Sequence, residues 1–288
     1  MSHPIKGIDH CFILVNTLDK SARHYARLGF TLSPKGLHSK DQGSANYTIM
    51  FANDYVELLG IVENTPANRD KREQLSQYGE GLYAIAGRID NAASARQELL
   101  KLGFHVSDIA HFSRPLPLPD GQQGIASFNT LSFDKSEVPN GIVFMCQHNT
   151  KQLVWRPELL HHENGALGIA AISIISQSPE NTAKAYARLF ADSDITKEHD
   201  AIRIHTGKAS ADILVLTDKA IQEKYPSFDL TKTPQNAYAA LSILVENLDK
   251  TKSVLTENKV DFHETPQHSL ALSPDFTSGV VIEFFSAS

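Results

Sequence analysis

The sequence predicts an α+β protein built from four modules, each with the order strand, helix and three strands (βαβββ), paired into two domains. Similar segments recur at the same point of a common pattern. VNTLDK at residues 15–20 resembles VENLDK at 245–250, and SARHYARLGF at 21–30 resembles SARQELLKLGF at 94–104. Such repetition is typical of a fold assembled from similar units. One module alone would leave a sheet face exposed to water, so we expect the modules to pair.

The first module covers residues 7–60. It begins with the apolar run CFILV of a buried strand. Its helix is predicted at Lys20–Leu28, because Gly29 follows as a C-terminal cap. Its remaining strands are predicted near Thr31–Ser33, Asn46–Ala52 and Tyr55–Leu59.

The other three modules repeat this order. Their first strands begin near Leu82, Leu167 and Ala237, and their helices are predicted at Ala92–Leu102, Asn181–Phe190 and Leu248–Asn258. Each closes with two apolar strand segments, at residues 127–133 and 141–147, 201–207 and 211–217, and 268–274 and 279–285.

Modules that are neighbours in sequence usually pack together. We therefore predict a first domain at residues 1–150, from modules one and two, and a second at residues 167–288, from modules three and four. The second is expected to support the first, because its strands carry few polar residues. The connection at residues 151–166 is too apolar for a free linker and is expected to dock on a domain.

Two residues of this connection are candidates for substrate binding. Trp155 could line a pocket or serve as inter-domain packing. Arg156 could hold a substrate carboxylate through two parallel hydrogen bonds, or it could form a salt bridge with Glu158 or Glu163.

Composition limits the class of protein. The chain has 288 residues and a net charge of −6, without clusters of basic residues, which argues against a nucleic-acid-binding surface. No apolar run approaches the length of a membrane span. Cys11 and Cys146 lie in apolar strands and are interpreted as reduced thiols, so a cytoplasmic location is expected. We expect a small-molecule substrate as the partner, and a homodimer is possible.

His10 opens the buried strand of the first module. Burying its polar ring costs free energy that Val or Ile would not cost. The ring is either satisfied by a backbone carbonyl, or it serves as a metal ligand or general base. Glu57, between Val56 and Leu58, raises the same question, because a buried carboxylate must be paired, protonated or metal-bound. If its strand is half exposed, Glu57 could instead point outward.

Paired βαβββ modules resemble the vicinal oxygen chelate superfamily, and the first half resembles its glyoxalase-like domain family. The stretches that carry this resemblance are residues 8–60 and 146–166, with a strand histidine, a Gly-x-His, a Gly-Ser-x-Asn turn and a Tyr-x-Glu strand. The resemblance implies that two modules form a cup around a divalent metal ion (Fe, Mn, Ni, Zn or Mg). It implies His10 and Glu57 as ligands. The third ligand would be His148 if modules one and two share a cup, or Glu283 if modules one and four do.

We therefore expect a metal-dependent enzyme with isomerase, lyase or dioxygenase chemistry on a small oxygen-bearing substrate. His38 or His148 would transfer a proton, and Asn46, which like His38 lies in a loop-rich stretch, would bind substrate. His38 could also be an ordinary surface histidine. The alternative function is a metal-free small-molecule binding or resistance protein that uses the same cup.

Overall fold

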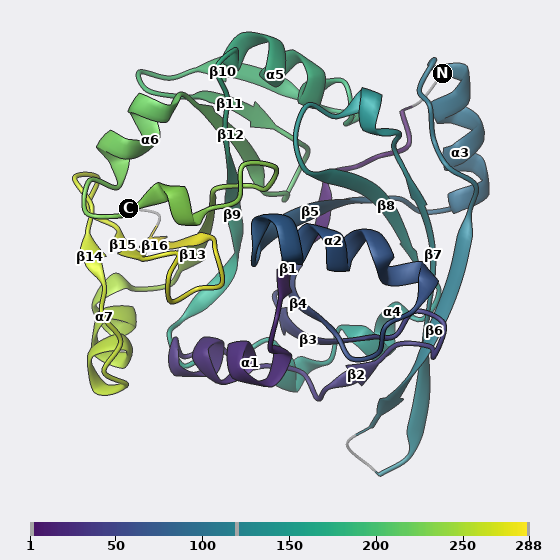
Figure 1. The fold of residues 1–288 in the computed structure, drawn as a ribbon, viewed down its shortest axis with the longest axis horizontal. Helices are drawn as coiled ribbons and strands as arrows, with labels where there is room; N and C mark the ends of the chain where they lie inside the picture. The colour runs from purple at the N-terminus through teal and green to yellow at the C-terminus, as the bar shows by residue number, and fades with distance from the viewer. Residues whose placement is uncertain (1–2, 119–120, 287–288) are drawn as a thin grey trace.

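The computed structural model describes residues 3–118 and 121–286 and contains two eight-stranded sheets that lie side by side (Figure 1). Each sheet is built from two consecutive βαβββ units. The predicted fold class is therefore confirmed. The exact domain boundaries at residues 150 and 167 stay a prediction.

The first sheet has the strand order β2-β3-β4-β1-β5-β8-β7-β6. At its centre, β1 pairs in antiparallel fashion with β5, which joins the first unit to the second. The first unit comprises β1 (Ile8–Val15), α1 (Leu18–Arg27), β2 (Gly36–Leu37), β3 (Ser44–Met50) and β4 (Tyr55–Ile61). The second comprises β5 (Gly81–Arg88), α3 (Ala92–Lys101), β6 (Ala110–Pro117), β7 (Gln123–Ser132) and β8 (Ile142–His148).

The second sheet repeats this arrangement in the order β10-β11-β12-β9-β13-β16-β15-β14. Its third unit comprises β9 (Ala166–Ile175), α5 (Pro179–Ala187), β10 (Asp194–Lys197), β11 (Ile202–His205) and β12 (Asp212–Leu216). Its fourth comprises β13 (Ala240–Val245), α7 (Leu248–Glu257), β14 (His263–Glu264), β15 (Leu270–Leu272) and β16 (Val281–Ser286).

Shorter helices lie in the connections: η1 (Pro66–Asn68) and α2 (Arg69–Tyr78) after β4, η2 (Lys135–Glu137) before β8, α4 (Lys151–Val154) and η3 (Pro157–Leu159) before β9, and α6 (Asp218–Lys224) and η4 (Leu230–Lys232) after β12. In the described ranges, no helix combines the length and the apolar composition that crossing a membrane requires.

The structure differs from the predicted elements at four strands. The strand expected at Thr31–Ser33 lies instead at Gly36–Leu37, because Pro34 has no amide hydrogen with which to continue a ladder. Strand β6 was not predicted, since its polar and proline-containing sequence AHFSRPLP does not read as a buried strand. The short polar strands β10 and β14 were not predicted either.

Strand alternation separates the core from the site. On β1, Cys11, Ile13 and Val15 belong to one continuous core that also includes residues of α1 and of the second sheet. His10 and Phe12 face the other way, toward the concave side of the first sheet. A hydrogen bond from Tyr25 Oη to the carbonyl of Thr277 (2.9 Å) connects the first and second halves of the chain.

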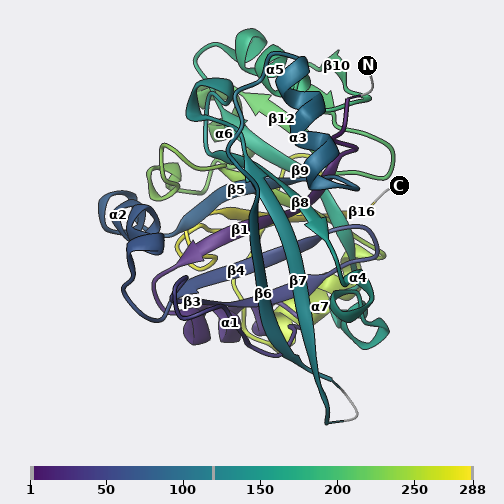
Figure 2. The same cartoon turned by 90° about the vertical axis from the view of Figure 1, so that its right-hand side faces the viewer.

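The first sheet curls into a cup. Its edge strands β2 and β6 contact each other, and Figure 2 shows β6 and β7 crossing in front of β1 and β4. Helix α2 lies over the opening (Figure 1), and none of its ten residues is buried. The cup therefore keeps an internal cavity.

The concave side of the second sheet is filled by its own chain. Ile221, Tyr225 and Phe228 pack onto it. Glu283 accepts hydrogen bonds there from Lys224 Nζ (2.8 Å) and Tyr225 Oη (3.0 Å). Glu283, the alternative third metal ligand, is therefore paired within the second sheet and lies away from His10.

Asp54 forms one of the contacts between the two sheets. It lies in the turn between β3 and β4, and its Oδ1 accepts a hydrogen bond from the backbone amide of Ile169 on β9 (3.1 Å). Burial raises the pKa of Asp54 to about 7, although that hydrogen bond and the charge of Arg88 act in the opposite direction. Folding therefore favours the protonated carboxyl group.

We expect an Asp54→Asn variant to be more stable than the wild type at pH 8, with a smaller difference at pH 5. The stabilisation from protonated Asp54 is fully present below pH 3.8 and is lost progressively as the pH rises from there through 7. The rise in the pKa of Asp54 from 3.8 to about 7 corresponds to a difference of about 4 kcal/mol at most in the free energy of unfolding. Thermal unfolding at both pH values measures it. Asp70→Asn, a change at an exposed aspartate, is the control, and an equal difference at both pH values would contradict the expectation.

Candidate functional site

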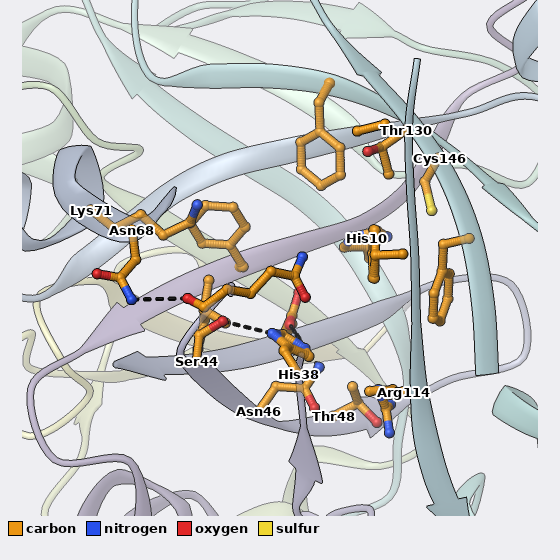
Figure 3. A pocket seen from close by; sticks show the side chains of 18 of the residues that line it. His10, His38, Ser44, Asn46, Thr48, Asn68, Lys71, Arg114, Thr130 and Cys146 are labelled. Carbon is orange, nitrogen blue, oxygen red and sulfur yellow. Dashed lines mark hydrogen bonds and ion pairs between the residues drawn. The ribbon is translucent and has the colours of Figure 1, made fainter. Parts of the chain in front are cut away.

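The cup of the first sheet encloses a cavity of about 350 Å³, which is within the range for a small-molecule site (Figure 3). Much of its wall is aromatic. Strands β1, β3, β4, β6, β7 and β8 and helix α2 all contribute to its lining. The ring-bearing residues are Phe12, Tyr55, Phe112, Phe128 and Phe144, together with His10, His38 and His111.

A β-bulge on β1 shapes one part of the wall. Ile8 pairs with Gly87 and His10 pairs with Ala86, so Asp9 is an extra residue in β1. In a regular strand, neighbouring side chains point to opposite faces. Here Asp9 Oδ1 instead accepts a hydrogen bond from His10 Nδ1 (2.7 Å). The bulge therefore brings two consecutive polar side chains together.

The last strand of the second unit completes this group. Cys146 and His148 are two residues apart on β8 and therefore point to the same face of the sheet. His148 Nε2 donates a second hydrogen bond to Asp9 Oδ1 (2.9 Å). The donor atoms of Asp9, His10, Cys146 and His148 all lie within 4.8 Å of one another. We call these four residues the donor group.

Asp9 is ionised in this group. Burial would raise its pKa, but hydrogen bonds from His10 and His148 and the charges of the two rings hold it well below its usual range. Arg88 Nε lies 3.9 Å from Asp9 Oδ2. Burial raises the pKa of the Cys146 thiol, assisted by the charges of Asp9 and Glu57, so this thiol is protonated.

The donor group suits a divalent metal ion. Two imidazoles and one carboxylate form the ligand combination of many iron sites, and His–carboxylate sets also bind zinc. One further observation supports the fit. His148 Nδ1 is buried without a hydrogen-bond partner among the residues that the structure describes.

Aromatic rings fix the two histidines. The Tyr55 ring stacks on His10 with a centroid distance of 4.2 Å, and Trp155 contacts His148 edge-on at 4.9 Å. The Trp155 indole donates to the carbonyl of Phe51 (2.9 Å), which attaches the connecting segment to the first sheet.

The structure places the two predicted substrate-binding residues of this segment outside the cavity lining. Trp155 lies behind His148. Arg156 donates to the carbonyl of Pro117 (2.8 Å) and lies 3.2 Å from Glu158. Arg156 thus forms the salt bridge that the sequence left open, and neither residue is part of the cavity lining.

A second polar group lies nearby on the same concave face. Asn46 Nδ2 donates to Glu57 Oε1 (2.7 Å), and His38 Nε2 lies 3.9 Å from that oxygen. His38 Nδ1 forms a hydrogen bond with Ser44 Oγ (2.8 Å) (Figure 3). Glu57 is not in the donor group. It pairs with Phe12 of β1, two residues beyond the pairing of His10 with Tyr55.

The surroundings of His38 favour its neutral form. Burial lowers its pKa, and the charge of Glu57 raises it in part, while Arg114 and Lys71 lower it further. The net result is a lowered pKa, so the ring is neutral at pH 7.

The sequence analysis did not name Arg114 as a candidate site residue, nor Asp9 or Cys146 as ligands. Arg114 lies on β6 and is 4% exposed. Its Nη1 has no hydrogen-bond partner within the described part of the chain, and neither does Asn46 Oδ1. Both atoms lie beside Gly36 of β2, where a Cβ would come within 2.5 Å of each. The alternation of Phe112, Arg114 and Leu116 was the available signal, since it places the arginine on an apolar face.

The structure thus brings His10, His38, Asn46 and Glu57 to the lining of one cavity and places His148 beside His10. The roles assigned to these residues stay predictions.

A cup of two βαβββ units with buried polar donors defines the vicinal oxygen chelate fold. Within it, the chain belongs to the glyoxalase-like domain family, whose model matches residues 8–190, well over half of the chain.

Solved structures share this fold at low sequence identity. A hypothetical protein from Staphylococcus aureus is 15% identical, with a TM-score of 0.67 over 97% of this chain and 99% of its own. A variant of 4-hydroxymandelate synthase from Streptomyces coelicolor is 13% identical, with a TM-score of 0.60 over 98% and 93%. A variant of homoprotocatechuate 2,3-dioxygenase from B. fuscum is 12% identical, with a TM-score of 0.57 over 100% and 73%. No curated protein matches the sequence.

In a Glu57→Gln variant, we expect the pKa of His38 to be lower than in the wild type, because the negative charge that raises it has been removed. An NMR titration of the His38 ring protons measures this change. Glu63→Gln, at an exposed position beyond β4, should leave the titration of His38 as it is. An unchanged His38 pKa in Glu57→Gln would show that the two side chains are not coupled.

Proposed function

We propose that this protein is a divalent-metal-dependent enzyme that acts on a small oxygen-bearing substrate in the first cup. The observation that carries the proposal is the donor group of Asp9, His10, Cys146 and His148, two of which, His10 and Cys146, line the cavity. The enzymes named among the structural neighbours, a synthase and a dioxygenase, support this class of activity as far as a shared fold can.

Asp9, His10 and His148 would hold the ion, with Cys146 beside them. Two histidines and one carboxylate favour iron and therefore the oxygenase branch over isomerase or lyase chemistry. When bound, the ion would supply a Lewis acid to an oxygen of the substrate.

The other residues of the cavity have roles that follow from their surroundings. Neutral His38 would accept a proton from the substrate. Asn46 and Glu57 would hold a polar substituent by hydrogen bonds. The aromatic wall would contact the apolar body of the substrate and keep water away.

A second candidate is a metal-free binding protein that uses the same cup. One observation favours it: Asp9 already accepts hydrogen bonds from both histidines, so its carboxylate is paired without an ion. Metal content decides between the two functions.

We expect protein purified without a metal-affinity tag to contain a stoichiometric transition metal by elemental analysis. His148→Gln should bind that ion at least about 10-fold more weakly, because a ligand is lost. Glu57→Gln is the matched control: it changes the same cavity but leaves the donor group intact. The sequence alone predicted Glu57 as a metal ligand, so that Glu57→Gln would weaken metal binding.

Trp155 offers a second measurement, since it is the only tryptophan and contacts His148. Adding paramagnetic Co²⁺ to metal-stripped protein should quench its fluorescence, and His148→Gln should abolish the quenching. If the wild type contains no metal and Co²⁺ leaves the fluorescence unchanged, the binding-protein function replaces the enzyme. If Glu57→Gln loses the ion, Asp9, His10 and His148 are not the ligand set.

A further inference from the structure

We propose that Arg114 binds a carboxylate of the substrate, so that the molecule accepted by the cup is a small monocarboxylic acid with an apolar or aromatic body. This inference deepens the proposed function and rests on it, since it assumes that the cavity is the substrate site.

Arg114 is a buried cation without a partner. Its side chain lines the cavity, yet it forms neither a hydrogen bond nor an ion pair within 4 Å to any residue in the ranges 3–118 and 121–286. A guanidinium stays charged at neutral pH even when burial lowers its pKa, as it does here. Leaving a buried charge unpaired costs folding free energy, which indicates that its partner is a ligand.

The contrast with Arg156 supports this interpretation. Arg156 is also buried, at 8% exposure, but its Nη1 donates to the carbonyl of Pro117 and its guanidinium forms an ion pair with Glu158. The fold therefore pairs the charge of Arg156 within the chain, whereas Arg114 lines the cavity without an ion pair to any described residue.

The fold makes room for Arg114 at a defined place. Gly36 has no side chain, and a Cβ there would come within 2.5 Å of Arg114 Nη1 and of Asn46 Oδ1. These two unpartnered atoms, a donor and an acceptor, lie beside the same glycine. The Arg114 side chain also lines the cavity, from where a carboxylate can accept hydrogen bonds from its guanidinium.

Local charge selects a monoanion. The charged side chains around this part of the cavity are Arg114, Lys71 and Glu57, because His38 is neutral. Their sum is a single positive charge. A carboxylate balances that charge and matches the planar guanidinium, whereas a phosphate dianion would be repelled by Glu57.

The remaining wall defines the rest of the ligand. Phe12, Phe112, Phe128 and Phe144 surround a volume of about 350 Å³. This lining favours an apolar or aromatic body of modest size. An aryl or branched alkyl carboxylic acid therefore combines the features that the cavity can recognise.

The test uses benzoate, phenylacetate and cinnamate, each paired with its uncharged amide, against the full chain in calorimetry and thermal-shift experiments. We expect at least one carboxylate to bind and its amide to bind much more weakly. Arg114→Gln should weaken carboxylate binding about 30-fold or more. Arg114→Lys should bind the carboxylate with intermediate affinity, since lysine keeps the positive charge but not the two parallel N–H donors of a guanidinium. Arg156→Gln, the matched buried arginine, should retain the affinity.

The melting temperature of Arg114→Gln distinguishes a ligand-binding role of Arg114 from a structural role, because the two roles predict opposite changes. If Arg114 serves the ligand, Arg114→Gln should melt at or above the temperature of the wild type, because an unpaired buried charge is removed. A clear loss of stability, together with unchanged carboxylate binding, overturns the inference. So does the failure of every carboxylate in the series to bind the wild type.

Measuring the same binding in the His148→Gln variant separates this inference from the metal-enzyme function. Carboxylate binding that depends on Arg114 and persists in His148→Gln supports the inference even if no metal is found. A protein that contains metal but does not discriminate carboxylates from amides overturns the inference alone.

Discussion

The antiparallel pairing of β1 with β5 is the contact on which the first half of the molecule depends. It joins two four-stranded units into one curved sheet and thereby creates the concave face that no unit has alone. It also sets the alternation that sends Cys11, Ile13 and Val15 into the shared core and His10 and Phe12 into the cup. The bulge in the same pairing brings Asp9 beside His10, so the donor group is a product of how the units join.

The cavity contains two groups that differ in their electrostatics. In the donor group, an ionised carboxylate is stabilised by the hydrogen bonds and charges of two histidines. Around Glu57, the charges of Arg114 and Lys71 outnumber the single carboxylate, and the closest hydrogen-bond donor to it is the uncharged amide of Asn46. Aromatic side chains on five strands line the cavity between the two groups. The arrangement suits a molecule with a coordinating oxygen, an apolar body and an anionic group.

Much of this could be predicted from the sequence, because repetition and strand alternation act locally. The order of elements followed from segments such as VNTLDK and VENLDK, and alternation placed His10 and Glu57 on the concave face. The donor group could not be predicted in full. Adjacent residues such as Asp9 and His10 point to opposite faces unless a bulge intervenes, and bulges leave little trace in a single sequence. Arg114 was missed for another reason: the two prolines and the exposed residues of β6 hid its strand pattern.

The contact between β2 and β6 has a consequence for association between molecules. Unpaired backbone groups along the margin of a sheet are templates on which another chain can add a strand, and proteins avoid aggregation by shortening or covering such margins. In the first sheet, one margin is a strand of only two residues, and it packs against the other margin. The second sheet leaves β10 fully exposed, but this strand carries charged residues at both ends, Asp194 and Lys197. The closure that shapes the cup therefore also protects the chain against edge-to-edge polymerisation.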